Sequence, residues 1–184
     1  MRRRSIRLKG YDYACRGAYF VTACAHGKEC IFDLPELRDA VEEAWRQIPV
    51  HFPNARPDES VVMPNHVHGI VWIVGANTVV GAQHAAPLPE PHTLAVKPGS
   101  LGAIVRSFKA AAAKRVNEIR GTPGAAVWQR NYYERVIRNE DELGSIRQYI
   151  HVNPLKWDLD CENPRRVASR EYARQWGWLE GGQE

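Results

Sequence analysis

Apolar and polar positions along this chain follow the period of a strand in some segments and that of a helix in others. Residues 17–25, GAYFVTACA, are rich in aromatic and β-branched side chains and are bounded by glycines, which predicts a strand. Asp33 stands three residues before Glu36, as at the start of many helices, and apolar residues then recur at helical spacing. The pattern predicts an amphipathic helix that ends near Pro49.

The next part of the chain predicts a pair of strands. Two apolar segments, residues 59–63 and 67–74, are separated by Pro64 and Asn65, which are turn residues and fit poorly inside a continuous strand. They indicate a hairpin or two adjacent strands. Residues 75–99 then change to Gly, Ala, Pro and His without a period, which is typical of an exposed insertion or a flexible loop.

The second half of the chain predicts two more helices with a strand between them. Residues 100–120 carry one apolar stripe at helical spacing, and residues 128–137 have the composition of a strand. Asn139 and Glu142 form a capping pair for a final helix, and Pro154 ends that helix because a residue before proline avoids the α region. The order is strand, helix, two strands, helix, strand, helix.

This order predicts an α+β fold of the ferredoxin-like or RRM-like kind, in which a small antiparallel sheet has helices packed mainly on one face. With 184 residues, 44% of them hydrophobic and 25% charged, the chain suits a single domain spanning residues 1–184. Within this domain we expect a basic N-terminal arm at 1–16, the flexible insertion at 75–99 and a C-terminal extension at 155–184.

Positive charge is the compositional feature that bears most on function. The net charge is +4 and the pI is near 9.0, and basic residues gather at the N-terminus and along one flank of the second predicted helix. Such groups follow the phosphates of a nucleic acid in some proteins and are ordinary solvated surface in others, and charge alone does not separate the two. The candidate DNA contacts are Arg2, Arg3, Arg4, Arg106, Lys109 and Arg120.

The cysteines and the apolar runs exclude two other classes of protein. The four cysteines include no CxxC pair, which indicates reduced, structural thiols. The longest apolar runs are about ten residues, half of the roughly 20 that a membrane span needs, and the basic N-terminus leads into no apolar stretch. We therefore expect a soluble, cytoplasmic protein with no membrane partner.

His66 and His68 are the first candidates for chemistry. They lie two residues apart in the apolar stretch VVMPNHVHGIVWIV, and alternate side chains of a strand emerge on the same face. Two imidazoles side by side form half of a metal site. Two such histidines are also found buried against aromatic neighbours, so the pair by itself leaves both interpretations open.

Tyr149 is the candidate nucleophile. Asn153 follows it one helical turn later in RQYIHVNPLKW, so the hydroxyl and the amide lie on one helix face, and Pro154 places both near an accessible helix end. With Asn153 as a third ligand, two imidazoles and one amide oxygen leave coordination positions open, which suits the divalent metals Mg²⁺ and Mn²⁺. Taken alone, Tyr149 would be a residue at the edge of the core with its hydroxyl in water.

At these residues the chain resembles the REP-associated tyrosine transposases, bacterial relatives of the single-strand insertion-sequence transposases in the HUH superfamily. The resemblance spans Arg4 to Pro154, in family order, through the segments RSIRLKGYDYACRGAYFVT, VVMPNHVHGI, SFKAAAAKRVN, VWQRNYYERVIRNEDEL and YIHVNP. It implies that His66 and His68 are the two histidines of the HUH motif. It also implies that Tyr149 is the nucleophile and Asn153 the third metal ligand, where the insertion-sequence relatives commonly place Gln.

The resemblance further implies a reaction and a partner. In such enzymes the tyrosine attacks a phosphate in single-stranded DNA, forms a 5′-phosphotyrosine link and frees a 3′-hydroxyl, and a second strand can reverse the step. The chain is then a metal-dependent endonuclease and strand transferase that acts on hairpin DNA of the REP type. Its expected place is the cytoplasm and nucleoid of a bacterium, as a monomer or a homodimer. Trp157 is a further candidate contact for single-stranded DNA.

Two other functions stay open on the sequence alone. The same fold and basic surface would serve a noncatalytic, domesticated module that binds nucleic acid. The same metal site would serve a hydrolase in which water attacks a small phosphoester. A covalent DNA adduct that depends on Tyr149 separates the first function from both of these.

Overall fold

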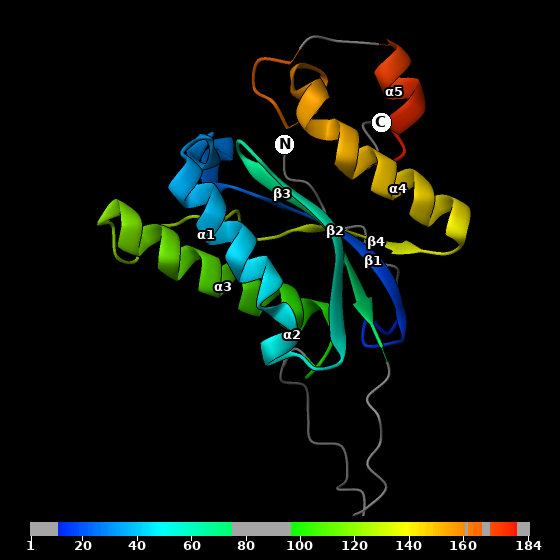
Figure 1. Ribbon diagram of the computed structural model, residues 1–184, viewed down its shortest axis with the longest axis horizontal. Coiled ribbons are helices and arrows are strands. Elements are labelled where there is room, and N and C mark those ends of the chain that lie inside the picture. The colour runs from blue at the N-terminus through cyan, green and yellow to red at the C-terminus, as the bar shows by residue number, and fades with distance from the viewer. Residues whose placement is uncertain (1–10, 75–96, 161, 167–169, 180–184) are drawn as a thin grey trace, which may run out of the picture.

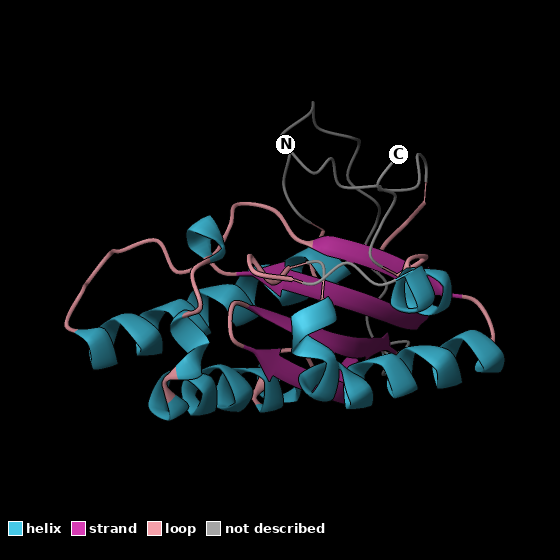
Figure 2. Cartoon of the chain, turned by 90° about the horizontal axis from the view of Figure 1, so that it is seen from above, coloured by secondary structure: helices cyan, strands magenta, loops and turns pink. Residues whose placement is uncertain are grey.

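A four-stranded antiparallel sheet in the order β2-β3-β1-β4 forms the centre of the molecule (Figures 1 and 2). The computed structural model describes residues 11–74, 97–160, 162–166 and 170–179. The strands are β1 (Gly17–Cys24), β2 (Ala55–Met63), β3 (His66–Ile73) and β4 (Tyr133–Ile137). The predicted α+β fold with an antiparallel sheet is therefore confirmed.

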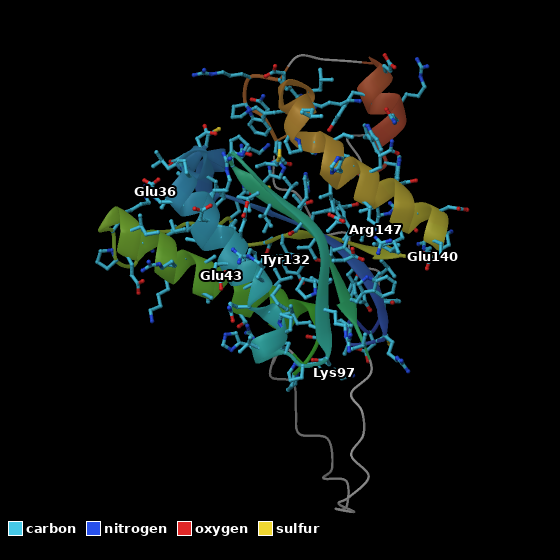
Figure 3. All side chains as sticks on the ribbon, in the orientation of Figure 1. Glu36, Glu43, Lys97, Tyr132, Glu140 and Arg147 are labelled. Atoms are coloured by element: carbon cyan, nitrogen blue, oxygen red, sulfur yellow. The ribbon has the colours of Figure 1, made fainter. Side chains whose placement is uncertain are left out.

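Five α-helices join and cover these strands in the described part of the chain. They are α1 (Pro35–Arg46), α2 (Ile48–His51), α3 (Leu101–Arg120), α4 (Glu140–Val152) and α5 (Arg170–Trp176). Figure 3 labels Glu140, the first residue of α4, and Arg147 near its middle.

The starts of the helices follow the sequence in two cases and depart from it in one. Ser100 and Asn139 cap α3 and α4, because each side chain accepts a hydrogen bond from the backbone N–H three residues further on. Helix α1 has Leu34 at its N-cap with no side-chain cap, and a proline in its first turn. The predicted capping pair of Asp33 and Glu36 is therefore not formed.

Strand β4 is shorter than the sequence pattern predicts. Trp128 forms only an isolated bridge with Ala25, and regular pairing with β1 includes no residue before Tyr133. In the stretch between them, Lys109 of α3 donates a hydrogen bond to the carbonyl of Gln129 at 2.6 Å, and the indole of Trp128 donates to the carbonyl of Lys109 at 3.0 Å. Hydrogen bonds with α3 therefore take the place of regular β-pairing in this stretch.

Helices cover both faces of the sheet (Figure 1). On one face, α1 and α3 pack with Tyr19 and Val21 of β1. On the other face, α4 and α5 pack with Phe20 of β1 and Ile70 of β3. Helices α1 and α3, which connect the strands, share one face as predicted. Helices α4 and α5 add a second layer on the opposite face.

Parts of two predicted segments lie outside the described residues, namely 1–10 of the basic arm and 75–96 of the insertion. Within the described chain, no helix is both long enough and apolar enough to cross a membrane. The cysteines described there, Cys15, Cys24 and Cys30, form no disulfide with one another.

Candidate metal centre and active site

Strand β3 places His66 and His68 side by side on the sheet face that α4 covers. The pairing of β3 with β1 sets His66 opposite Cys24 and His68 opposite Thr22. The Nε2 atoms of the two imidazoles lie 2.8 Å apart, and both side chains are buried. The strand alternation seen in the sequence therefore brings the two rings to one point.

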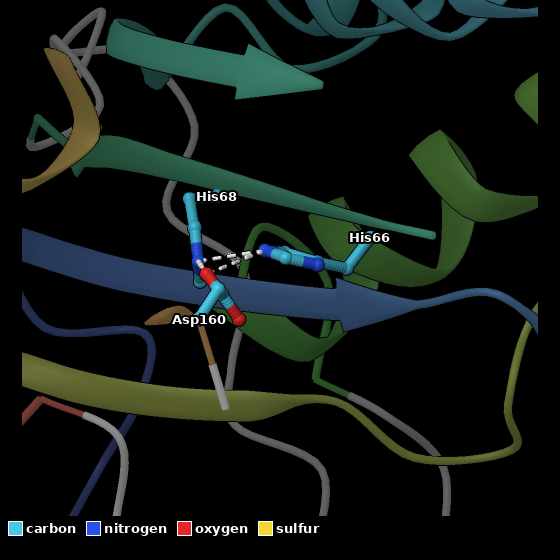
Figure 4. Close-up of side chains that lie close together, drawn as sticks. All are labelled: His66, His68 and Asp160. Atoms are coloured by element: carbon cyan, nitrogen blue, oxygen red, sulfur yellow. Dashed lines mark hydrogen bonds and ion pairs between the residues drawn. The ribbon is translucent and has the colours of Figure 1, made fainter. Parts of the chain in front are cut away.

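A carboxylate joins the two histidines to form a group of three potential ligands (Figure 4). Oδ2 of Asp160 lies 3.7 Å from Nε2 of His66 and 3.8 Å from Nε2 of His68, and all three residues are buried. Asp160 follows directly on the 3-10 segment η3 (Asn153–Leu159). Asp160 was not among the predicted ligands, because it lies in irregular chain where no period or motif marks it.

The surroundings of Asp160 fit a bound cation. In the described part of the chain its Oδ2 atom accepts no hydrogen bond, whereas Oδ1 accepts one from the N–H of Glu162 at 2.6 Å. Burial by itself raises the pKa of this carboxyl, but the facing imidazoles of His68 and His66 hold the pKa well below its ordinary value. Two imidazole nitrogens and one ionised oxygen form a donor set that a divalent metal ion accepts.

Tyr149 of α4 lies at this group. Its hydroxyl oxygen is 3.2 Å from Nε2 of His68, and its ring stands edge-on to Phe20 with 6.0 Å between centroids. The side chain is 2% exposed, and the ring of Trp176 from α5 lies 5.5 Å away. The structure therefore brings Tyr149 to the histidines, but the expectation of an accessible helix end is wrong, since the C-terminal segment covers it.

Asn153 is the C-cap of α4, one turn after Tyr149, and its backbone N–H bonds to the carbonyl of Tyr149. The α-helix passes into η3 at this residue, so the chain does not leave helical structure at Pro154. The side chain is 1% exposed, and among the described residues neither atom of its amide has a hydrogen-bond partner. A buried, unpaired amide is costly, and a ligand would satisfy it.

Polar side chains contact the outer nitrogen of each histidine. Oδ1 of Asn65 lies 2.9 Å from Nδ1 of His66, and Oγ1 of Thr22 lies 2.8 Å from Nδ1 of His68. The ring of His68 also stacks on Phe20, with 5.4 Å between centroids. Each imidazole is thus held on the side away from Asp160, as metal-bound histidines usually are.

The candidate DNA contacts lie in different places. Arg2, Arg3 and Arg4 are outside the described residues, and Arg106 and Arg120 are exposed on α3, which covers the sheet face opposite the histidines. Trp157 differs from them, because its partly exposed ring lies 5.9 Å from that of His66.

Lys109, the remaining basic candidate, is engaged within the protein. Its amine donates hydrogen bonds to the carbonyls of Gln129 at 2.6 Å and Asn131 at 3.3 Å. Burial lowers the pKa of this amine. Because hydrogen bonds to backbone carbonyls occupy its amine, Lys109 is poorly placed to bind a phosphate.

Comparison with known proteins finds similarity both in sequence and in structure. A protein of Haemophilus influenzae strain Rd, described only as uncharacterized, is 41% identical over 173 residues, which cover 86% of this chain and 91% of that protein. A solved structure of a REP-associated tyrosine transposase bound to a REP hairpin matches 82% of this chain and 73% of its own, with a TM-score of 0.54 and 20% identity. No protein-family model matches the chain.

Fold and site together define an α+β protein with the fold of a REP-associated tyrosine transposase and a buried His-His-Asp group that could hold a metal ion. The chain belongs to the same family as the Haemophilus protein. The resemblance seen in the sequence is thus confirmed in the fold.

Proposed function

We propose that this protein is a metal-dependent endonuclease and strand transferase that cuts single-stranded DNA with Tyr149. The observation that carries the proposal is the hydroxyl of Tyr149, 3.2 Å from Nε2 of His68 in the group formed with His66 and Asp160. A tyrosine hydroxyl, with an ordinary pKa of about 10, is a weak nucleophile at neutral pH and needs such partners.

The proposed step exchanges one phosphate ester for another. A bond forms between the Tyr149 oxygen and phosphorus while the bond from phosphorus to the 3′ oxygen breaks. The phenol releases its proton to solvent, and the leaving 3′ oxygen takes up a proton from solvent and departs as a hydroxyl, so that no net proton is gained or lost. Because the number of ester bonds is unchanged, the 3′-hydroxyl of a second strand can reverse the step without a nucleotide cofactor.

The metal in this proposal is Mg²⁺ or Mn²⁺, held by His66, His68 and Asp160. When bound, such an ion neutralises negative charge on the phosphate. Asp160 takes the third ligand position that the sequence analysis gave to Asn153. The buried amide of Asn153, one turn beyond Tyr149, is then an additional oxygen donor.

The proposed substrate is hairpin DNA of the REP type, since the solved structure with the same fold holds a REP hairpin. We also propose that Trp157 stacks on an unpaired base beside the scissile phosphate, and the proximity of its partly exposed ring to that of His66 supports this role. The remaining phosphate contacts that we propose are Arg2, Arg3, Arg4, Arg106 and Arg120.

The test is a covalent adduct, seen on a denaturing gel after protein, Mn²⁺ and single-stranded hairpin DNA are mixed. We expect an adduct with the wild type and none with Tyr149→Phe, because this change removes the nucleophile. Tyr133→Phe is the matched control, expected to form the adduct. Its ring also stands edge-on to Phe20, at 6.4 Å, but its hydroxyl interacts with Arg135 instead of a histidine.

Each other outcome points to a different function. An adduct that Tyr149→Phe forms as well as the wild type overturns the proposal. Tight hairpin binding without an adduct, unchanged by His66→Ala, supports the noncatalytic module. Turnover of a small phosphoester that survives Tyr149→Phe supports the hydrolase.

A further inference from the structure

Asn65, the residue before the first histidine, is held in one orientation by its partners. Its side chain is fully buried. The Nδ2 atom donates hydrogen bonds to two backbone carbonyls, that of Lys28 at 3.0 Å and that of Glu162 at 2.8 Å. Because carbonyl oxygens only accept, the amide nitrogen must face them, and Oδ1 must be the atom that faces His66.

This orientation determines the tautomer of His66. Oδ1 of Asn65 only accepts and lies 2.9 Å from Nδ1 of His66, so Nδ1 carries the proton. In a neutral imidazole the other nitrogen, Nε2, then carries a lone pair. Nε2 is the atom that faces His68 and Asp160, and it is the atom with which a metal ion would bond.

His68 is held less strictly. Its Nδ1 atom faces Oγ1 of Thr22 at 2.8 Å, and a hydroxyl can donate or accept. Since Nε2 of His66 carries no proton, the 2.8 Å contact between the two Nε2 atoms needs a proton on His68, and Thr22 then donates to Nδ1. Rotation of the Thr22 hydroxyl lets His68 take the opposite tautomer when it becomes a ligand.

We infer that Asn65 is the positioning residue of this site. It holds His66 in the Nδ1–H form, ready to bind a metal through Nε2, while Thr22 lets His68 change tautomer. Through the carbonyl of Glu162 it also ties the segment that carries Asp160 to the start of β3. This inference rests on the proposed metal site, and Asn65 itself touches no reacting atom.

The first test reads the tautomers of the wild-type protein without metal. Long-range proton–nitrogen correlation spectra of the imidazole rings are recorded at about pH 8, above the ordinary histidine pKa of about 6.5. We expect His66 to be protonated at Nδ1 only and His68 at Nε2 only. A His66 ring protonated at Nε2, or at both nitrogens, overturns the inference. This measurement needs neither a variant nor a bound metal.

The second test is the affinity for Mn²⁺, measured by calorimetry. Asn65→Ala should weaken binding by roughly 10- to 100-fold, the range found for residues that orient metal-bound histidines. Asn117→Ala is the matched control and should leave the affinity unchanged. Asn117 is also buried and donates to a backbone carbonyl, that of Ala125 at 2.9 Å, but it lies on α3 across the sheet.

A Thr22→Val variant tests the contact of the second histidine, His68, separately from that of His66. The change keeps the shape of the side chain and removes only the partner of His68, so we expect the tautomer of His66 to stay as in the wild type. A change in the His66 tautomer in this variant would contradict the separate roles of Asn65 and Thr22.

The inference and the proposed function fail in different ways. A wild-type protein that binds no Mn²⁺ and forms no DNA adduct contradicts the proposed function. A wild-type protein that binds Mn²⁺, matched in affinity by a folded Asn65→Ala variant, contradicts only the positioning role.

Discussion

Gly69, the residue directly after His68, lies at a close approach between strand β3 and helix α1. A Cβ atom added at this position would overlap the indole of Trp45. A glycine inside a strand often marks such an approach of a neighbouring element. The distance between the sheet and α1 at this point therefore depends on Gly69, a residue next to the candidate site.

Replacing Gly69 with alanine should lower the free energy of unfolding by about 1–3 kcal/mol, the usual cost of overfilling a core. Trp45 has little room to move, because its ring also stands edge-on to Phe108 at 5.0 Å. Urea unfolding measures the effect. Gly144→Ala is the matched control: nothing lies within 4 Å of its added Cβ on α4, and we expect a gain of about 0.5–1 kcal/mol. Equal stability of Gly69→Ala and the wild type would contradict the close approach.

Local periods explain which site residues could be predicted from the sequence. The period of a strand puts His66 and His68 on one face, and the period of a helix does the same for Tyr149 and Asn153. Asp160 could not be found in this way, because its position depends on distant contacts. One of them is the hydrogen bond from Asn65 to the carbonyl of Glu162, 97 residues further along the chain.

Helix α4, as an element, contacts strand β2 through a group of polar side chains near its middle. Arg147 donates hydrogen bonds to Asp58 of β2 through Nε at 3.2 Å and Nη2 at 2.5 Å, and the indole of Trp72 donates to the same carboxylate at 2.8 Å. Asp58 lies in the irregular stretch of β2 between Pro57 and Ser60, where the pairing with β3 shifts register. The contact holds α4 two residues before Tyr149, the nucleophile of the proposed reaction.

Asp58→Asn should lower stability by about 1 kcal/mol at neutral pH, as for a partly exposed ion pair. Burial by itself raises the pKa of the Asp58 carboxyl, but hydrogen bonds from Arg147, Trp72 and the Glu59 N–H outweigh burial and lower it below 3.8. A carboxyl with a lowered folded pKa stabilises the protein above its unfolded pKa, and this contribution disappears as the pH falls through the folded pKa.

Unfolding free energies of Asp58→Asn and the wild type at about pH 7 and about pH 3 check this prediction. The difference between the two proteins should shrink in acid. A difference that stays constant across this range would show that Asp58 acts through its shape and not through its charge.

The sequence also predicts the order of elements better than the layers around them. The nearly continuous apolar run of β1 is typical of a strand buried on both faces, which the structure has. The apolar run of β1 does not indicate which helices cover each face, because the apolar side of any amphipathic helix could pack against it. The second layer depends on α5, a helix of 7 residues without a sustained period.

At the scale of the whole molecule, the sheet separates two cores with different roles. Trp45 belongs to the core shared with α1 and α3, whereas Trp176 belongs to the core that contains Tyr149. Both indoles are 3% exposed, and within the described residues neither Nε1 atom has a hydrogen-bond partner. The two tryptophans therefore contribute mainly through packing, and they form a matched pair on opposite faces.

Trp45→Ala and Trp176→Ala should each cost about 3–5 kcal/mol of stability, as for other large buried rings. Their effects on the site should differ, because the ring of Trp176 lies 5.5 Å from that of Tyr149. Amide hydrogen exchange, at a temperature where both variants stay folded, should rise in α4 for Trp176→Ala and in α1 and α3 for Trp45→Ala. Equal exchange of α4 in both variants would mean that the sheet transmits the loss of either ring, and that the site is not insulated from the opposite core.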